Sequence, residues 1–339
     1  MAQKKGQRTL ILDNPPTIMA FAAIGSKKEA EGPMGGYFDY LDTDGTFGEK
    51  SWEKAESSMQ KKAVEKALNK CSLSPSEIDF AFAGDLLNQC AGSTFGLRDM
   101  GIPLLGVYGA CSTMAEGLLL ASLFIEAGFG QYTLAATSSH FCSAERQFRF
   151  PLEYGGQRPP TAQWTATAAG SVVLGAGHAP PYVRAVTVGQ IEDLGVKDAN
   201  NMGAAMAPAA AGTLKRFFED TNTNQDNYDL ILTGDLGQIG SDLLMQLMKA
   251  EGYDLSSRHS DCGIMMYDRK SQPEVGAGGS GCGCSAAILC GYMLPKLKNE
   301  GISNLLFMAT GALMSPTTTQ QGETIPGIAH LVWISSNPS

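Results

Sequence analysis

The sequence predicts an α/β protein built from two similar halves, each with a mixed, largely parallel sheet covered by helices. The first observation is a repeated phrase, because DFAFAGDLLNQ at 79–89 returns as DLILTGDLGQ at 229–238. The second is an echo in the same order: GACS at 109–112 precedes LAAT at 134–137, and CGCS at 282–285 precedes FMAT at 307–310. The third is the alternation of strand-like and helix-like stretches within each half. The repeat is far longer than the roughly 20–50 residues of a solenoid unit.

The first half supplies its elements in a clear order. Residues 51–71 have apolar side chains at three- and four-residue steps, which predicts an amphipathic helix. After a Ser-Pro-Ser turn, the apolar run 78–83 predicts a buried strand that ends at Gly84 and Asp85. The stretch 117–130 is apolar on every face and therefore predicts a helix buried all round.

The second half repeats this order. A helical stretch near 204–220 leads to a predicted strand at 229–233, a helix at 241–251 and a sister of the buried helix at 285–298. We therefore divide the chain into an N-terminal half, 1–178, and a C-terminal half, 179–339. The first half closes with a Pro- and Gly-rich stretch, about 140–178, which we expect to be an irregular insert with a functional role.

Composition narrows the classes of function. The 339 residues carry a net charge of −9, which argues against a broad nucleic-acid or anionic-lipid surface but leaves room for a local cationic pocket. The eight cysteines contain no CxxC pair and there are four histidines, so we expect no metal site and reduced thiols typical of the cytosol. We see neither a secretory signal nor an apolar run of ~18 residues, so we expect membrane contact to be peripheral or through a partner.

Cys111 is the first candidate for chemistry. It comes directly before the buried helix, where unpaired backbone N–H groups and the helix dipole stabilise a thiolate or a bound anion. The other interpretation is that Cys111 is a small buried apolar residue, as free cysteines commonly are.

Three further groups of residues are candidates for ligand contacts. The Gly-rich stretch 276–287 opens a helix and offers backbone amides to an anion, or else it permits close packing of two helices. His140 follows a predicted strand and is either a base or a structural residue. Arg146 and Arg149 form either a carboxylate clamp or surface ion pairs. The candidate ligand-binding set is Cys111, Ser138, Ser139, His140, Arg146, Arg149, Asp85, Asn88, Asp235, Gly281, Cys282 and Gly283.

Asp85 and Asp235 end the two repeated strands. They either form a polar pair at the site or cap the helices that follow. The residues alone leave both interpretations open.

The duplicated unit, with a cysteine heading a buried helix in one half and a Gly-rich helix start in the other, resembles the thiolase and ketoacyl-synthase superfamily. Over nearly the whole chain it resembles one branch more closely, the stage V sporulation protein AD family of endospore-forming bacteria. The phrases that carry this resemblance are AGDLLNQ, GACST, AATSSH, AERQFR, EYGGQRP, MAPAAA, LILTGDL, AEGYD, AGGSGC, ATGALMSPT and ETIPGIAH.

The resemblance implies two mixed five-stranded sheets in α-β-α-β-α layers and a protein that binds dipicolinic acid without a cofactor. It further implies a part in moving calcium dipicolinate into the developing spore, together with membrane-embedded products of the same operon. We therefore expect a cytoplasmic protein held at the forespore inner membrane by its partners. Related enzymes dimerise through the sheet edge of the first half, so a homodimer is also an expectation.

The departures from the superfamily pattern bear on activity. Condensing enzymes of this kind need a second-half histidine and a further histidine or asparagine beside the cysteine. In this sequence the position of the second-half histidine lies in TGDLG at 233–237, which contains no histidine. The position of the asparagine falls on Gly283 or Cys282. We therefore expect binding of a small planar dianion rather than catalysis. The alternatives are an active acyltransferase that uses Cys111, with His140 as substitute base, and a docking subunit of a membrane transport complex.

Overall fold

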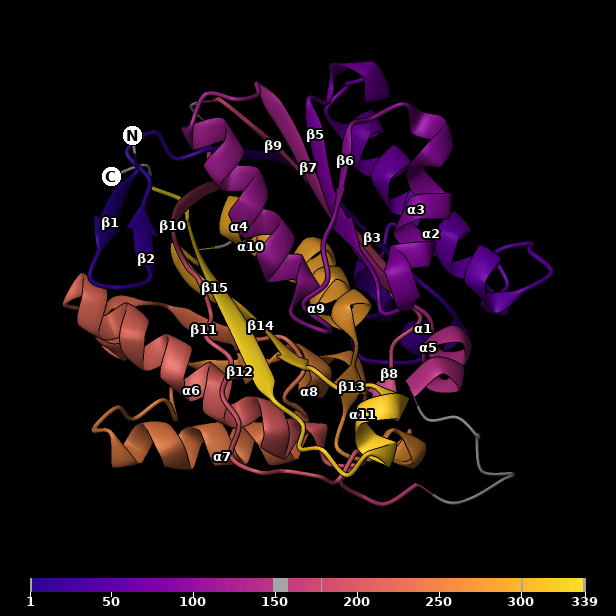
Figure 1. Ribbon diagram of the computed structural model, residues 1–339. Helices are drawn as coiled ribbons and strands as arrows, with labels where there is room; N and C mark the ends of the chain where they lie inside the picture. The colour runs from indigo at the N-terminus through magenta and orange to yellow at the C-terminus, as the bar shows by residue number, and fades with distance from the viewer. Residues whose placement is uncertain (1, 149–157, 178, 300, 338–339) are drawn as a thin grey trace.

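The structure, a computed structural model, describes residues 2–148, 158–177, 179–299 and 301–337 (Figure 1). In the first half five strands lie in the order β6-β5-β7-β9-β3. Strand β5, next to the edge strand β6, pairs in parallel with β6 and β7, and β9 pairs antiparallel with β7 and β3. The bounds are β3 Thr17–Gly25, β5 Phe80–Gly84, β6 Leu104–Gly106, β7 Tyr132–Ser139 and β9 Ala168–Gly175.

The second half repeats this topology strand for strand. The order is β12-β11-β14-β15-β10, with parallel pairs around β11 and antiparallel pairs on both sides of β15. The predicted duplication and the two mixed five-stranded sheets are therefore confirmed. One pair, Thr17 with Tyr182, also joins the two sheets edge to edge. The bounds are β10 Tyr182–Thr187, β11 Leu230–Thr233, β12 His259–Asp261, β14 Asn304–Ala312 and β15 Gly327–Ser335.

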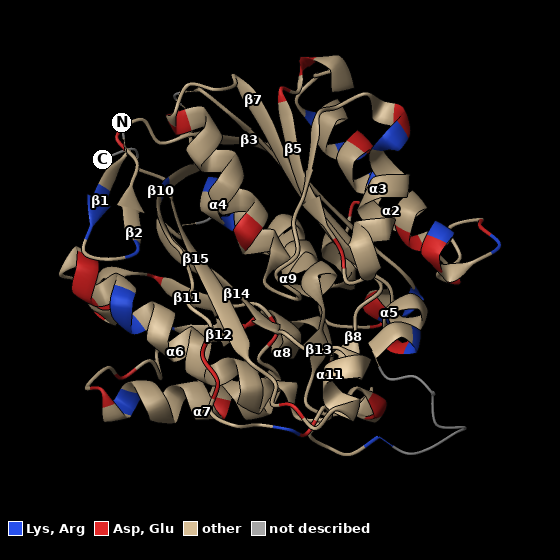
Figure 2. Cartoon of the chain, in the orientation of Figure 1, with Lys and Arg blue, Asp and Glu red and all other residues tan. Residues whose placement is uncertain are grey.

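Helices cover both sheets and fill the space between them. Helices α4 and α9 pack between the sheets, while α2 and α3 cover the first sheet and α6 and α7 the second (Figure 1). Charged residues gather on the outer helices and loops, and none lies along α9 (Figure 2). The helices are α1 Lys27–Ala30, α2 Trp52–Lys70, α3 Ala91–Leu97, α4 Thr113–Glu126, α5 Phe141–Phe148, α6 Met202–Thr221, α7 Gly237–Ala250, α8 Cys262–Met266, α9 Cys282–Ile288, α10 Leu294–Asn299 and α11 Pro316–Gln320.

Five short strands lie outside these two five-stranded orders. β1 and β2 form a hairpin on β10, β4 adds to β3, and β8 pairs with β13 in a separate two-stranded sheet. Within the described ranges no helix is both long and apolar enough to cross a bilayer. The bounds are β1 Gln3–Lys5, β2 Thr9–Ile11, β4 Tyr40–Leu41, β8 Trp164–Thr165 and β13 Gly279–Ser280.

Regular secondary structure occupies much of the stretch 140–178. The stretch 140–178, expected to be irregular, contains helix α5 and strand β9. Strand β9 is buried along its whole length and pairs on both sides, with β7 and β3. Its residues AAGSVVLG are small and apolar, so they fit a strand that is covered on both faces. The Pro and Gly density nearby concealed this regular segment.

Candidate functional site

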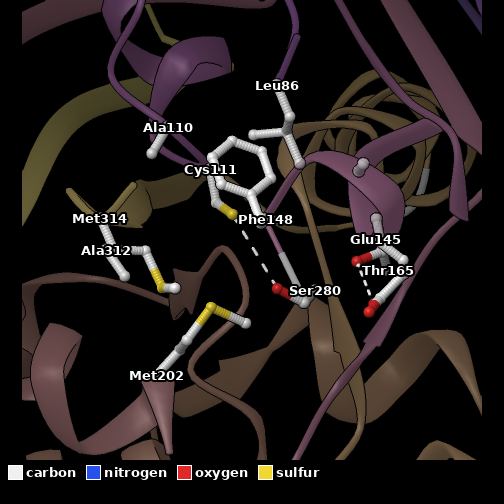
Figure 3. Close-up of a pocket in the computed structure, with 11 residues that line it drawn as sticks. Leu86, Ala110, Cys111, Glu145, Phe148, Thr165, Met202, Ser280, Ala312 and Met314 are labelled. Atoms are coloured by element: carbon white, nitrogen blue, oxygen red, sulfur yellow. Dashed lines mark hydrogen bonds between the residues drawn. The ribbon is translucent and has the colours of Figure 1, made fainter. Parts of the chain in front are cut away.

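A small cavity lies beside Cys111, where the loop before α4 meets α5, β8, β13 and the end of β14 (Figure 3). Its volume is about 40 Å³ and its walls are mostly apolar. The lining residues are Leu86, Ala110, Cys111, Ala144, Glu145, Phe148, Thr165, Met202, Ser280, Ala312 and Met314. This cavity, called the Cys111 pocket below, draws on both halves of the chain.

A sharp turn places Cys111 in the pocket. Ser112 Oγ donates to the Gly109 carbonyl at 2.6 Å, and Thr113 Oγ1 donates to the Ala110 carbonyl at 2.6 Å. Ala110 has a φ of 51°, a left-handed backbone conformation that costs about 1–3 kcal/mol for a residue with a side chain. Helix α4 begins at Thr113, so Cys111 precedes the helix rather than lying in it. The turn directs the thiol into the cavity (Figure 3).

Asp235 and Ser280 are the polar neighbours of this thiol. Ser280 Oγ lies 3.9 Å from Cys111 Sγ and donates to the Asp235 carboxylate at 3.1 Å. The same carboxylate accepts hydrogen bonds from the Gly281 amide at 3.0 Å and from Thr310 Oγ1 at 2.9 Å. The Asp235 carboxylate thus already occupies hydrogen-bond donors of the kind that hold an oxyanion in condensing enzymes.

The electrostatics hold Cys111 in the thiol form. Burial raises its pKa well above the usual value, and the charge of Asp235 raises it further. Burial also raises the pKa of Asp235, to about 6, so this carboxylate is charged at neutral pH. A nucleophilic cysteine requires the opposite environment, with a base or a cation that favours the thiolate.

The histidines that the structure describes lie elsewhere. His140 Nε2 bonds to the Gly45 carbonyl at 2.8 Å, and its ring packs beside Trp52. His259 Nε2 bonds to Thr233 Oγ1 at 2.9 Å, and His330 Nδ1 accepts from the Gly189 amide at 3.1 Å. None of these three lines the Cys111 pocket. The interpretation of His140 as a substitute base for Cys111 was therefore wrong, since its ring is committed to the Gly45 loop.

Ser138, Ser139, Cys282 and Gly283 form the buried junction of β7 and α9. Ser138 Oγ donates to Glu56, Ser139 Oγ donates to the Ala166 carbonyl, and Cys282 Sγ lies 3.0 Å from the Ser138 carbonyl. A Cβ on Gly283 would lie 2.0 Å from the Ala168 carbonyl oxygen. None of the four lines the pocket. Gly283 therefore permits close backbone packing, which was the alternative interpretation of this Gly-rich helix start. Gly281 instead reaches the site, because its amide donates to the Asp235 carboxylate.

Of the predicted arginine clamp, the structure places Arg146 alone. Arg146 pairs with Glu53 on the other side of α5, and Arg149 lies outside the described residues. Asn88 is near Arg146 in a separate hollow of about 520 Å³. The lining of that hollow is Glu53, Leu87, Asn88, Ala91, Ser143, Arg146, Gln147, Pro316 and Gln320.

The two repeated aspartates have different roles. Asp85 accepts from the Leu87 amide at 2.9 Å and from both the amide and Oγ of Ser93 at 2.7 Å, so it fixes the turn into α3. Asp235 instead reaches Ser280 beside Cys111. The two carboxylates therefore do not form a polar pair. Asp85 therefore has the capping role, whereas Asp235 has the predicted role at the site.

Sequence reasoning missed several pocket residues. Glu145 accepts from Thr165 Oγ1 at 3.0 Å (Figure 3). It also pairs with Arg158 at 2.9 Å. Burial raises the pKa of Glu145, and the Arg158 charge opposes that rise. Ser280 pairs with Thr165 in the β8 and β13 ladder, which places both hydroxyls at the pocket. The only signal for Glu145 and Ser280 was their position inside the phrases AERQFR and AGGSGC.

Among the described residues no group of three or more His, Cys, Asp or Glu side chains is arranged to hold a metal ion. Within the described ranges, the polar groups at the pocket include one ion pair, two hydroxyls, one thiol and the Asp235 network behind Ser280. Such an arrangement can hold a small molecule by contact and by a few hydrogen bonds.

Solved structures of condensing enzymes share this fold. 3-Oxoacyl-[acyl-carrier-protein] synthase III from Aquifex aeolicus VF5 matches with a TM-score of 0.58 at 14% identity, over 94% of this chain and 99% of that one. Cerulenin-bound OleA from Xanthomonas campestris matches with a TM-score of 0.61 at 12% identity, over 95% and 98%. The tetronic acid condensing enzyme AbyA1 matches with a TM-score of 0.60 at 16% identity, over 93% and 99%. At such identities the likeness establishes the thiolase-like fold alone.

Sequence comparison goes further than fold. The model of the family described as stage V sporulation protein AD (SpoVAD) matches residues 6–335. The stage V sporulation protein AD of Bacillus subtilis (strain 168) is 44% identical over 325 residues, which cover 96% of each chain. The chain therefore belongs to the stage V sporulation protein AD family of sporulation proteins, on a fold that it shares with condensing enzymes.

Proposed function

We propose that the chain binds dipicolinate in the Cys111 pocket without catalysing acyl transfer, and that it thereby takes part in the uptake of calcium dipicolinate into the forespore. One observation carries the proposal: the pocket is present, but the thiol beside it faces Asp235 and Ser280. A pocket without an activated nucleophile suits binding better than condensation.

The pocket walls carry surfaces that suit a flat ring with polar groups at its edge, and the side chains must move apart to admit such a ring because the free volume is about 40 Å³. Met202, Met314 and Phe148 supply polarisable and aromatic surface that adapts to a ring face. The hydroxyls of Thr165 and Ser280 lie at the pocket wall, where each donates its one hydrogen to Glu145 or Asp235 and would have to turn from that acceptor to a carboxylate oxygen of the ligand. Arg158, behind Glu145, offsets the negative charge that this carboxylate brings to the wall. A pyridine ring with two carboxylates offers both kinds of surface.

Calorimetric titration with dipicolinate, with and without calcium, tests the proposal. We expect saturable binding, and weaker binding of isophthalate, which lacks the ring nitrogen. Thr165→Val removes one pocket hydroxyl at nearly constant volume and should weaken binding about tenfold, the effect of roughly one hydrogen bond to a charged group. Ser122→Ala is the matched control, because Ser122 Oγ bonds within α4 to the Leu118 carbonyl and lies outside the pocket. A folded protein that gives no heat at millimolar ligand would overturn the proposal.

The link to spore uptake needs a cellular measurement. In a sporulating host, Thr165→Val in place of the native residue should lower the dipicolinate content of spores, while Ser122→Ala should leave it unchanged. Binding in solution with no change in spore dipicolinate would separate the ligand from the transport role.

An acyltransferase is the rival activity. Its test is incubation with acyl-CoA followed by the intact mass of the protein. We expect no adduct, because the pKa of Cys111 is raised by burial and by Asp235. An adduct that disappears in Cys111→Ala would replace binding by catalysis as the function.

A docking role is favoured by an exposed apolar segment and is compatible with binding. Val188, Ile191 and Leu194 are 40%, 57% and 70% exposed on the connection between β10 and α6. Backbone bonds between Glu192 and Gly327 hold this segment in place. We propose that it meets a membrane-embedded product of the same operon and keeps the protein at the forespore inner membrane. Replacement of Ile191 and Leu194 by Ser should release the protein from the membrane fraction without weakening dipicolinate binding; unchanged membrane association would exclude this surface.

A further inference from the structure

We propose that a groove between Arg158 and Arg269, outside the Cys111 pocket, is an outer docking site where an anionic carboxylate ligand is captured before it enters the pocket. This inference rests on the proposed binding function. It concerns a surface separate from the pocket lining, and it assigns the route of entry rather than the final position of the ligand.

The groove is a distinct cavity of about 650 Å³. Prolines form much of its wall, so that wall is rigid and offers no backbone N–H to compete for a ligand. The lining residues are Arg158, Pro159, Pro160, Trp164, Arg269, Pro273, Glu274 and Gly276.

Arg269 has only neutral partners within the described residues. Its Nε donates to the Gly276 carbonyl at 2.8 Å, and its Nη1 donates to Gln238 Oε1 at 3.2 Å. The acidic residue of the groove, Glu274, is engaged by Lys28 instead. Arg269 therefore presents an uncompensated positive charge to the groove.

Arg158 is held in place by an ion pair, and one of its N–H donor groups remains unused by the described residues. Its Nη2 pairs with Glu145 at 2.9 Å, whereas its buried Nη1 has no hydrogen-bond partner among the residues that the structure describes. Its guanidinium lies 5.7 Å from the ring centres of both Phe141 and Trp164, which stack on each other at 3.9 Å. A buried donor without a partner is costly, so a carboxylate oxygen in the groove would be stabilising once the guanidinium turns to expose Nη1.

A single thin wall separates the groove from the pocket. Glu145 lines the pocket and Arg158 lines the groove, and the two are in direct contact. Successive strand residues point to opposite faces, so on β8 Trp164 faces the groove and Thr165 faces the pocket. In Figure 3, Glu145 and Thr165 are joined by a hydrogen bond at the pocket side of this wall. A ligand carboxylate bound at Arg158 is thus one side chain away from the interior.

The negative charge of the whole chain makes a local positive site useful for capturing an anion. A net charge of −9 repels a dianionic ligand at long range. A local pair of guanidinium groups reverses the sign of the field at one entrance and favours bidentate contact with carboxylates. The arginine of the hollow beside α5, Arg146, is already paired with Glu53. The Arg158 and Arg269 groove is therefore better suited than that hollow to capture an anion.

Stopped-flow mixing of the full chain with dipicolinate at low ionic strength tests this route. We expect Arg269→Gln to lower the association rate constant about threefold or more, and to reduce the dependence of that rate on salt. The equilibrium constant should change less, because the bound ligand has left the groove. Arg98→Gln is the matched control, since Arg98 is exposed, pairs with Asp99 and lines a different hollow.

The outcomes separate this inference from the proposed function. Equal association rates for Arg269→Gln and Arg98→Gln would overturn the docking site while leaving pocket binding intact. A change confined to the dissociation rate would also overturn it, because Arg269 would then contact the bound ligand. Absence of any equilibrium binding in the native chain would instead remove the proposed function itself.

Discussion

The Oγ of Ser280 lies 3.9 Å from the Sγ of Cys111 and donates a hydrogen bond to the Asp235 carboxylate at 3.1 Å. The second half of the chain thus places an acid and a hydroxyl, not an imidazole, behind the cysteine of the first half. Burial and the carboxylate both raise the pKa of Cys111 and oppose formation of a thiolate, because burial removes water from the negative charge and the carboxylate repels it, whereas the Ser280 hydroxyl acts weakly in the opposite direction.

Asp235→Asn should make Cys111 more reactive. Loss of the neighbouring charge lowers the pKa of the thiol, so the thiolate fraction at a given pH rises, by about tenfold for each unit of pKa. The rate of alkylation by iodoacetamide at pH 8 measures this change, and mass spectrometry of peptides assigns it to Cys111. Cys111→Ser in the same background should abolish the gain. An unchanged rate in a folded Asp235→Asn protein would show that burial alone controls the thiol.

The pH dependence of stability should reveal Glu56. Burial, with a further contribution from the charge of Asp85, raises its pKa from 4.5 to about 8. The folded state therefore binds a proton that the unfolded state has lost between pH 4.5 and 8. The stabilising effect is complete below pH 4.5 and disappears as the pH rises through 8, with a slope of up to about 1.4 kcal/mol per pH unit.

Glu56→Gln should flatten this slope, because an amide imitates the neutral acid and can still bond to Ser138 and Ser143. Urea unfolding at a series of pH values provides the measurement. Glu65→Gln, an exposed position on the same helix, is the control and should leave the slope unchanged. Parallel curves for Glu56→Gln and the native chain would mean that Glu56 is ionised throughout.

Gly283→Ala should act on folding rather than on a ligand. The added Cβ would lie 2.0 Å from the Ala168 carbonyl and 2.7 Å from the Ser139 amide, so α9 or β7 must move. Overpacking of this kind costs about 3 kcal/mol or more. Thermal unfolding measures the loss, and Gly36→Ala, where an added Cβ meets no atom within 4 Å, is the control. A stable Gly283→Ala chain that no longer binds dipicolinate would restore the ligand role predicted from the sequence.

The fold was predictable because its signals are local and repeated. The amphipathic pattern at 51–71 matches α2, the apolar stretch after Cys111 lies in α4, and the repeated strands match β5 and β11. The duplication then required the second half to follow the first. Strand β9 was missed because its small residues, between glycines, carry no alternation.

The site was harder to predict because it depends on the direction of side chains brought together from distant segments. His140 and Glu145 lie on successive turns of one segment, yet one points to Gly45 and the other to the pocket. No short-range pattern distinguishes them. Ser280 gains its role from the ladder with Thr165, a contact across more than a hundred residues.

The outer edge of β6 should join two copies of the chain. β6 is the last strand of its sheet, and Leu104, Leu105 and the nearby Tyr108 are each more than a third exposed. An exposed apolar edge strand is a ready template for pairing with another chain, and pairing with its own copy would bury these side chains and extend both sheets. Leu105→Lys should therefore convert a dimer into a monomer, because the lysine ammonium would face its own symmetry-related copy. Sedimentation velocity gives the measurement, with Ile191→Lys in the other half as the control. A native chain that sediments as a monomer at micromolar concentration would contradict the predicted interface, whereas a dimer unaffected by Leu105→Lys would move it to another surface.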